Sequence, residues 1–196
     1  MAAGLSSRLG RPKALVRVGA MSLLRRSLVL GAPLSRWPPR VVVPPRAHRY
    51  RCEARGIAAR FIVNPERAAG LSTSVRRGIA AARFASVVLI VPMDLACLTR
   101  RDLLRLIHRW RGAPRRLTAR RIDPGRGREI RGGAPLILPK WLFARALEAS
   151  GDAGLRDLID TLSPAAVTLV ELPSAALDVD TADDLAAARR RWRRAG

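Results

Sequence analysis

The sequence predicts an α/β fold that is built on a mostly parallel sheet. Two observations carry this prediction. Short apolar runs rich in β-branched residues alternate with longer stretches of helical periodicity along the chain. Strands that are separated by helices pair in parallel through right-handed crossovers. The length of 196 residues suits a single domain over residues 1–196, with enough chain to bury a core.

Four apolar runs are predicted as strands that are buried on both faces, because almost no polar residues alternate with the apolar ones. These strands are Arg40–Val43, Arg60–Val63, Ser86–Val91 and Val167–Val170. The helical stretches between and around them are Met21–Leu30, Ser72–Phe84, Arg100–Trp110, Lys140–Ala149 and Thr181–Arg193.

Local signals mark where helices begin and where the chain turns. Thr99 and Thr181 each precede a helical stretch with acidic residues in its first turn, so both are predicted as N-caps. The segment Ile122–Pro135 contains four glycines and two prolines. We therefore expect a loop there rather than a core element.

The chain is strongly basic, with 37 Lys and Arg against 15 Asp and Glu and a net charge of +22. All of these cations except Lys13 and Lys140 are arginines, and they are spread along the chain, which has only 4% aromatic residues. A nucleic-acid site usually gathers basic residues and interleaves them with aromatic ones. We therefore expect a solvated, arginine-rich surface and no nucleic-acid partner. A small polyanionic ligand is compatible with the same composition.

Other site classes are excluded on residue counts. Cys52 and Cys97 are too few and too far apart for a disulfide framework or a zinc site, and His48 and His108 are the only histidines.

No apolar run approaches the roughly 18 residues of a membrane-spanning helix, so no membrane is expected as a partner. The basic N-terminal stretch lacks the apolar core of a secretory signal, which makes the cytoplasm the expected location.

Residues 2–13, AAGLSSRLGRPK, are the most informative stretch for function. Small residues around Gly4 let a backbone approach a ligand closely, and consecutive amides can form a nest for an anion. Arg8 adds a forked cation and Lys13 a point charge, both suited to phosphate oxygens. A flexible basic tail is the alternative, and physics alone leaves both interpretations open. The stretch does not have the Walker pattern.

Three aspartates are candidates for a cation site. Asp94 follows a predicted buried strand, and open parallel sheets place their ligands at the carboxyl ends of strands. A carboxylate there suits Mg²⁺, which prefers oxygen ligands, although a solvated turn aspartate is the alternative. Asp178 and Asp180 lie two residues apart, so they share one face of an extended segment. Such a pair suggests a cation, or one member caps the helix at Thr181.

Six segments, in order along nearly the whole chain, resemble motifs of the nucleotidyltransferase family that includes the molybdenum cofactor cytidylyltransferases. The segments are AAGLSSRLGRPK (2–13), NPERAAGLSTS (64–74), VPMD (91–94), GGAPLILP (132–139), GDAGLR (151–156) and LDVDTADDL (177–185). The first segment is more similar to the cytidylyltransferase branch than to the guanylyltransferase branch, which more often has a second glycine where Ala3 stands.

This resemblance implies a Rossmann-like, three-layer α/β/α fold and a Mg²⁺-dependent nucleotidyl transfer. An NTP, with CTP as the first expectation, would give its nucleoside monophosphate to a phosphate on a small acceptor such as molybdopterin, releasing pyrophosphate. A molybdoenzyme or its maturation chaperone is the implied kind of protein partner. Two alternatives stay open: a nucleotidyltransferase for a sugar phosphate or another cofactor precursor, and a non-catalytic basic protein that binds nucleic acid.

The resemblance also implies a role for each matching residue. The residues expected to be catalytic are Lys13, Arg8 and Asp94. The residues expected to bind the nucleotide are Ala2, Ala3, Gly4, Ser6, Arg8, Lys13, Asn64, Gly70, Ser72 and Ser74. Those expected to bind the acceptor are Gly151, Asp152 and Arg156, and those expected to bind the metal are Asp94, Asp178 and Asp180.

Three positions depart from the family pattern. The family has a complete apolar strand directly before its first motif, where this sequence has Met1. The first strand is therefore expected to be truncated, either really or through a start site that is set too late, and Val16–Val18 is the nearest candidate for the vacant position. The family's Asp-x-Pro order is reversed in Pro92-Met93-Asp94, and Ala182 replaces a proline.

Overall fold

The structure is a computed structural model that describes residues 9–123 and 129–195. Its helices are α1 (Leu23–Gly31), α2 (His48–Glu53), α3 (Leu71–Ala81), α4 (Arg100–Arg111), α5 (Phe143–Leu147), α6 (Arg156–Asp160) and α7 (Ala182–Ala195). Its strands are β1 (Arg17–Val18), β2 (Met21–Ser22), β3 (Arg40–Val43), β4 (Arg60–Val63), β5 (Val87–Ile90), β6 (Leu117–Ile122), β7 (Arg131–Pro139) and β8 (Val167–Val170).

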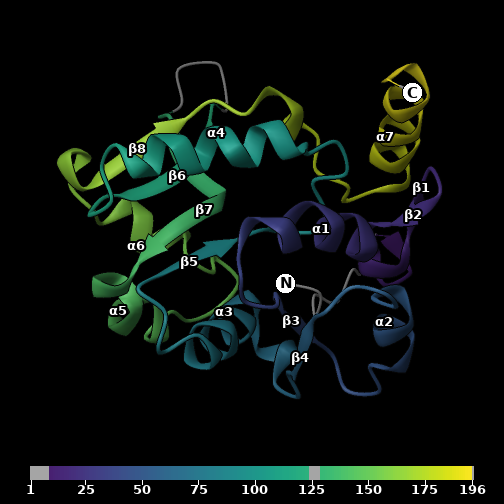
Figure 1. Cartoon of the computed structure of the whole chain (residues 1–196), viewed down its shortest axis with the longest axis horizontal. Coiled ribbons are helices and arrows are strands. Elements are labelled where there is room, and N and C mark those ends of the chain that lie inside the picture. The colour runs from purple at the N-terminus through teal and green to yellow at the C-terminus, as the bar shows by residue number, and fades with distance from the viewer. Residues whose placement is uncertain (1–8, 124–128, 196) are drawn as a thin grey trace.

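The described strands form one four-stranded sheet and two pairs (Figure 1). The larger sheet has the order β5-β7-β6-β8, β3 pairs with β4, and β1 pairs with β2. β7 is antiparallel to both β5 and β6, whereas β8 is parallel to β6 and β4 is parallel to β3. In the larger sheet β5, β6 and β8 therefore run in one direction and β7 in the other. The α/β class is confirmed, and β7 is the exception to the parallel arrangement.

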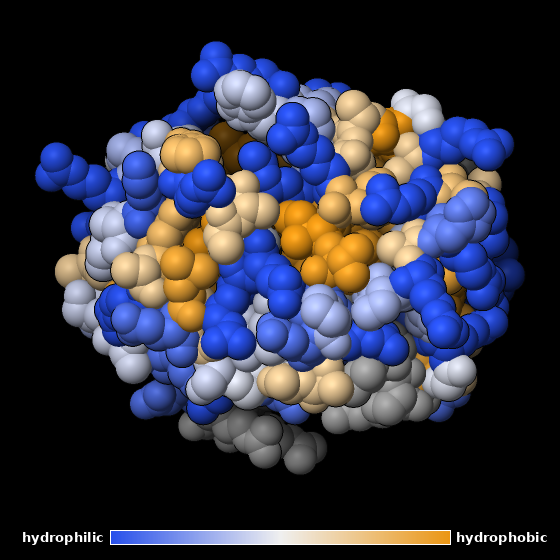
Figure 2. Space-filling view, turned by 90° about the horizontal axis from the view of Figure 1, so that it is seen from below, coloured by the Kyte–Doolittle hydropathy of each residue, from blue (hydrophilic) through white to orange (hydrophobic). Residues whose placement is uncertain are grey.

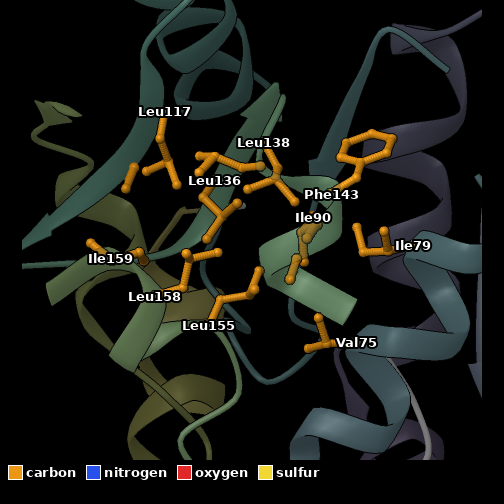
Figure 3. Close-up of a cluster of buried hydrophobic side chains, with 13 residues drawn as sticks. Val75, Ile79, Ile90, Leu117, Leu136, Leu138, Phe143, Leu155, Leu158 and Ile159 are labelled. Carbon is orange, nitrogen blue, oxygen red and sulfur yellow. The ribbon is translucent and has the colours of Figure 1, made fainter. Parts of the chain in front are cut away.

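Alternate residues of this sheet face two different cores, which gives the molecule its three layers. One core joins the sheet to α3, α5 and α6 (Figure 3). Figure 3 shows Ile90, Leu136 and Leu138 of the sheet in one cluster with Val75 of α3 and Leu158 of α6. The opposite core joins the next residues along the same strands to α4; its members include Leu89, Leu103, Leu106, Ile137 and Val170. This period-two division is what a sheet covered by helices on both faces requires.

The four predicted strands are present at or within one residue of their expected bounds, and their burial differs from strand to strand. Val41, Val42 and Val43 of β3 are buried as predicted. The prediction of burial on both faces is wrong for β4 and β8, where Val63 and Leu169 are exposed. Position at the edge of a sheet does not explain the difference, because β3 is an edge strand as well and its three valines are buried.

The loop predicted over Ile122–Pro135 is partly wrong, because β7 begins at Arg131. Gly132 and Gly133 are strand residues here. A Cβ at Gly132 would lie 2.8 Å from the Ile159 side chain, and one at Gly133 would overlap Ile122. The glycines are therefore needed for close packing of β7 against α6 and β6 rather than for a turn. The sequence analysis also missed β6 and the short helix α2.

The segment Val16–Val18 does not join the larger sheets. Arg17 and Val18 form β1, which pairs with β2 in a small antiparallel ribbon. Val16 and Val18 pack instead against α7 through a cluster that includes Leu185 and Ala188. Figure 1 shows α7 beside this ribbon, away from the larger sheet. The expectation that Val16–Val18 fills a vacant strand position is therefore wrong.

The surface is dominated by polar side chains. Figure 2 shows hydrophilic residues over most of one face, with apolar patches between them. No helix in the described part of the chain combines the length and apolar character needed to cross a bilayer.

Candidate functional site

One lysine and three aspartates gather near the end of β5. The carbonyl oxygen of Asp94 accepts a hydrogen bond from the amide of Val179 at 2.9 Å, which fixes the segment 178–180 against the end of β5. Val179 is fully buried, whereas Asp178 is exposed and Asp180 is half-buried. The Lys13 ammonium forms an ion pair with the Asp180 carboxylate. Segments from both ends of the chain thus meet at this point.

Asp94 is the carboxylate with the most perturbed surroundings. Burial raises the pKa of its carboxyl group above the ordinary value, the Lys13 ammonium lowers this pKa, and the negative charge of Asp178 raises it again. The net shift of the pKa is upward. Because the charged form of Asp94 is disfavoured, a cation placed beside it would relieve the electrostatic cost.

Sequence analysis missed Arg120, which positions Asp178. Arg120 lies on β6, is almost fully buried, and donates from Nη1 to the carbonyl oxygen of Ala175. The same nitrogen lies 3.4 Å from Asp178 Oδ1. A signal for Arg120 is present in the sequence. Arg120 places a charged side chain within the strand Leu117–Ile122, at a position that is buried in the structure. A buried arginine needs such partners.

The start of α7 holds Asp180 in place. Asp184 Oδ2 accepts hydrogen bonds from the amides of Asp180 at 3.1 Å and Thr181 at 2.8 Å, and from Thr181 Oγ1 at 2.8 Å. The amide of Asp184 donates to Thr181 Oγ1 at 3.2 Å. This reciprocal pair is a capping box, which confirms Thr181 as the N-cap. Thr99 is likewise confirmed by its capping box with Asp102.

Asn64 is buried, and its side chain makes three hydrogen bonds within the predicted segment 64–74. Its Nδ2 donates to Thr73 Oγ1 and to Ser74 Oγ, both at 2.9 Å, and its Oδ1 accepts from the amide of Glu66 at 3.1 Å. These bonds tie the end of β4 to the first turns of α3. The Asn64 amide group is engaged within the protein, so its side chain shapes this corner of the molecule.

Two of the predicted binding segments lie in contact. The amide of Ser72 donates to the carbonyl oxygen of Gly151 at 3.1 Å. Gly70 has a φ of +104°, and a Cβ there would lie 2.5 Å from that same oxygen. A Cβ at Gly154 would lie 2.9 Å from the Leu71 side chain. The structure therefore brings residues 70–74 beside 151–156, with Ser72 and Ser74 buried and with Gly151, Asp152 and Arg156 exposed.

The two groups of residues share one edge of the molecule. Ala14, Val43 and Met93 pack in a single cluster. Lys13 and Asp94 are the sequence neighbours of Ala14 and Met93, and the amide of Asn64 donates to the carbonyl oxygen of Val43 at 2.8 Å. The cation and carboxylate group thus lies close to the corner that Asn64 organises. Five predicted site residues lie outside the described residues: Ala2, Ala3, Gly4, Ser6 and Arg8.

The donor set fits a hard divalent cation only in part. Among residues 9–123 and 129–195, no three His, Cys, Asp or Glu side chains lie close enough together to hold a metal by themselves. Mg²⁺ is usually bound through one or two carboxylates, with substrate phosphates and water completing its shell. Asp94 with Asp178 or Asp180 matches that requirement, because the oxygens lie on two segments that Val179 joins.

Comparison with protein families gives one match, which covers residues 1–167 and is described as the MobA-like NTP transferase domain. A comparison with curated protein sequences gives no match.

Three solved structures illustrate the shared fold. Rv0371c from Mycobacterium tuberculosis is 24% identical, with 96% of this chain and 94% of that chain covered and a TM-score of 0.75. It has also been solved in complex with manganese. The 2-C-methyl-D-erythritol 4-phosphate cytidylyltransferase of Thermus thermophilus is 22% identical, with coverage of 95% and 96% and a TM-score of 0.66. Molybdopterin-guanine dinucleotide biosynthesis protein A of Archaeoglobus fulgidus is 16% identical, with coverage of 98% and 96% and a TM-score of 0.68.

Proposed function

The chain belongs to the MobA-like NTP transferase domain family of nucleotidyltransferases, and on that premise we propose that it transfers CMP from CTP to a phosphate group on a small acceptor, with release of pyrophosphate. The observation that carries the proposal is the gathering of Lys13 with Asp94, Asp178 and Asp180 near the carboxyl end of β5. A triphosphate is bound through positive charge on its phosphate oxygens. Lys13 supplies one such charge, and the aspartate oxygens suit a divalent cation that supplies the other.

The reaction asks for positioning and charge neutralisation rather than for a protein nucleophile. An oxygen of the acceptor phosphate attacks the α-phosphorus in line, the bond from the α-phosphorus to the bridging oxygen of the β-phosphate breaks, and pyrophosphate leaves with that electron pair. The acceptor phosphate is already anionic near neutral pH, so no general base is needed.

Each candidate residue has a defined role in this scheme. Lys13, together with Arg8, neutralises charge that develops on the leaving pyrophosphate. Asp94 with Asp178 or Asp180 would hold Mg²⁺, which when bound offsets the negative charge of the phosphate oxygens. Arg120 keeps the Asp178 carboxylate in place from the buried side. The manganese complex of Rv0371c supports the use of a divalent cation.

The remaining candidates divide between nucleotide and acceptor. Gly70, Ser72 and Ser74 at the start of α3 are proposed to face the nucleotide, together with Asn64, which donates to Ser74 Oγ, and with Ala2, Ala3, Gly4 and Ser6. Gly151, Asp152 and Arg156 are proposed to face the acceptor, because Arg156 is an exposed cation suited to a phosphate. The hydrogen bond between Ser72 and Gly151 supports this division, since it joins the segment proposed for the nucleotide to the segment proposed for the acceptor.

Molybdopterin is the first acceptor to test, and a sugar phosphate is the second. The names of two structural relatives refer to molybdopterin-guanine dinucleotide and to 2-C-methyl-D-erythritol 4-phosphate, and both relatives share the fold. If the acceptor is molybdopterin, a molybdoenzyme or its maturation chaperone is the protein that receives the product.

The test is release of pyrophosphate from each of the four NTPs, with Mg²⁺ and with either molybdopterin or a panel of sugar phosphates. The proposal expects turnover with CTP that depends on an acceptor and stops when EDTA removes the metal. Turnover with an NTP other than CTP would show that the proposed base is wrong, and turnover with a sugar phosphate but not with molybdopterin would show that the proposed acceptor is wrong. No turnover with any combination of NTP and acceptor would overturn the proposal.

A further inference from the structure

Four loops meet at the edge of the sheet that lies opposite the carboxyl end of β5. β5 and β6 run in one direction and β7 in the other, so the loops before β5 and β6 lie beside the loop after β7. The amide of Lys140 donates to the carbonyl oxygen of Ser86 at 3.0 Å across this edge. The loop before β3 joins them, because Trp37, Ala85 and Arg111 line one cavity. We call the loops 35–39, 82–86, 111–116 and 139–142 the basal edge.

The basal edge carries the exposed aromatic rings of the described chain. The exposed fractions are 62% for Trp37, 83% for Phe84 and 51% for Trp141. The other aromatic side chains are buried or half-buried. Burial of a ring is favourable, so exposed rings that are gathered in one place indicate a surface that contacts a partner.

Each of these rings directly follows a cation in the sequence, in the pairs Arg36-Trp37, Arg83-Phe84 and Lys140-Trp141. In two pairs the cation also lies over the ring. The Arg83 guanidinium is 4.3 Å from the centroid of the Phe84 ring. The Arg36 guanidinium is 5.3 Å from the centroid of the Trp37 ring. The basal edge therefore presents a flat aromatic surface and a positive charge side by side.

The third ring is held across two of the loops. Nε1 of Trp141 donates to the carbonyl oxygen of Arg115 at 2.8 Å. This hydrogen bond satisfies the only polar group of the indole and leaves the side chain half exposed. The ring is thus positioned at the surface beside the cations of the loop 111–116.

The positive charge of the basal edge is not balanced within the protein. Its four loops contain six Lys and Arg and no Asp or Glu. All six cations are exposed, and none of them forms an ion pair with a carboxylate of the described residues. A bound polyanion would relieve the repulsion among them. The six are Arg36, Arg83, Arg111, Arg115, Arg116 and Lys140.

A single-stranded nucleic acid matches both properties of this surface. Its phosphates pair with cations, and its bases can stack on exposed aromatic rings. A duplex has no free base faces to stack. A protein partner usually meets an apolar centre with charges at the rim, whereas here a cation accompanies each ring. The cations and rings are spread along the sequence, which predicts no such partner, and it is the fold that interleaves them.

We propose that the basal edge binds single-stranded nucleic acid, with bases stacked on Trp37, Phe84 and Trp141 and phosphates held by the six cations. This surface lies at the opposite end of the strands from Lys13 and Asp94. It is therefore separate from the candidate functional site, and the proposal does not depend on the activity proposed above.

The test measures binding of a fluorescein-labelled strand of about 12 thymidine nucleotides by fluorescence anisotropy, at about 150 mM salt. A duplex of the same length and a polyglutamate of similar charge are measured in parallel. Two variants, Trp37→Leu and Phe84→Leu, remove a ring but keep an apolar side chain, and Phe84→Trp keeps a ring. Melting temperatures check that each variant is folded.

We expect Trp37→Leu and Phe84→Leu each to weaken binding of the single strand by about tenfold, the usual cost of one lost stacking partner. Phe84→Trp should bind within about twofold of the original protein. The duplex and the polyglutamate should bind more weakly, and their affinity should not depend on the rings.

A matched pair of double variants separates the basal edge from the general positive charge. Arg36→Gln with Arg83→Gln removes two cations from the basal edge, and Arg190→Gln with Arg193→Gln removes two exposed cations from α7. The first pair should weaken binding of the single strand at least tenfold more than the second.

Four results would overturn the proposal. The single strand does not bind, or Phe84→Leu and Phe84→Trp bind it equally well. The two double variants have equal effects, which would make the attraction a property of the whole charged surface. Polyglutamate binds as tightly as the single strand and with the same dependence on the rings, which would make the basal edge a surface for an acidic polypeptide.

Discussion

At the scale of single residues, the two lysines of the chain form a natural pair for experiment. Lys13 is tied to Asp180, while Lys140 is exposed at the far end of β7. We expect Lys13→Ala to lower kcat by about 10²–10³-fold, the usual cost of one lost donor in a preorganised site. Lys140→Ala removes the same charge from the surface and should leave turnover unchanged. Equal effects of both substitutions on pyrophosphate release would contradict the role of Lys13.

Asp94 should show opposite effects on stability and on activity. Its pKa is raised in the folded state, so the folded protein binds the proton more tightly than the unfolded chain does. The contribution of Asp94 to the free energy of unfolding is therefore greatest at a pH below the pKa of the unfolded state, about 3.9. This contribution is lost as the pH rises through the higher pKa of the folded state. At pH 7 we expect Asp94→Asn to raise the melting temperature while it lowers Mg²⁺-dependent turnover by orders of magnitude.

The control for Asp94 is Asp160→Asn, because Asp160 is an exposed aspartate at the end of α6. It should change neither property. An Asp94→Asn protein that turns over within a few-fold of the original would exclude Asp94 as a metal ligand, and a lower melting temperature at pH 7 would contradict the electrostatic argument.

At the scale of elements, the start of α3 depends on Gly70. Its φ of +104° is strained for any residue with a Cβ, and that Cβ would meet the Gly151 carbonyl oxygen. We expect Gly70→Ala to lower the free energy of unfolding by about 1–3 kcal/mol. It should also raise KM for both substrates, because the segments proposed to bind the nucleotide and the acceptor would be pushed apart. Urea denaturation and steady-state kinetics measure the two effects.

Gly112→Ala provides the comparison for Gly70→Ala. Gly112 follows α4 with a φ of −71°, and its nearest neighbour to an added Cβ is 3.5 Å away. That substitution should change stability by less than about 1 kcal/mol and leave KM unchanged. If Gly70→Ala were equally mild, the contact with Gly151 would not be what holds the two segments together.

The capping box of α7 makes this helix sensitive to acid. Hydrogen bonds from the Thr181 hydroxyl and from the amides of Thr181 and Asp180 lower the pKa of Asp184. Because the pKa of Asp184 is lower in the folded state, its carboxylate adds to the free energy of unfolding at a pH above the pKa of the unfolded state. This contribution is lost as the pH falls through the pKa of the folded state. We expect Asp184→Ala to melt at a lower temperature than the original protein at pH 7 and the gap to narrow below about pH 4.

Asp183→Ala tests whether this effect comes from the capping box or from the helix dipole. Asp183 is exposed in the same first turn, so its loss removes charge but keeps the box. Its melting temperature should fall by less than that of Asp184→Ala. A larger fall for Asp183→Ala would assign the stabilisation to the dipole.

At the scale of the whole molecule, the net charge of +22 predicts attraction to any polyanion, and salt separates the two functions that this charge allows. CTP binding should require the divalent cation and weaken by less than about tenfold between 50 and 200 mM salt. Duplex DNA binding that rests on many phosphate contacts would weaken by about 10³-fold or more over the same range. Tight, metal-independent binding of DNA would favour the basic nucleic-acid-binding alternative.

Local patterns along the sequence predicted several of the elements and suggested residues for a phosphate and metal site. The apolar runs indicated β3, β4, β5 and β8, and Thr99 and Thr181 ahead of acidic first turns indicated two N-caps. Such features depend on neighbours within a few residues, which a single sequence displays directly. The order of the motifs also indicated the family to which the chain belongs.

Contacts between residues that are far apart in the sequence became visible only in the folded chain. Lys13 and Asp180 are 167 residues apart in sequence yet form an ion pair, and buried Arg120 reaches Asp178 from another strand. β7 is a strand despite its glycines: Gly132 and Gly133 pack directly against the side chains of Ile159 and Ile122, which would have to shift to admit a Cβ at either position. Strand pairing and close packing are set by long-range contacts, and the local pattern of residues carries no direct record of them.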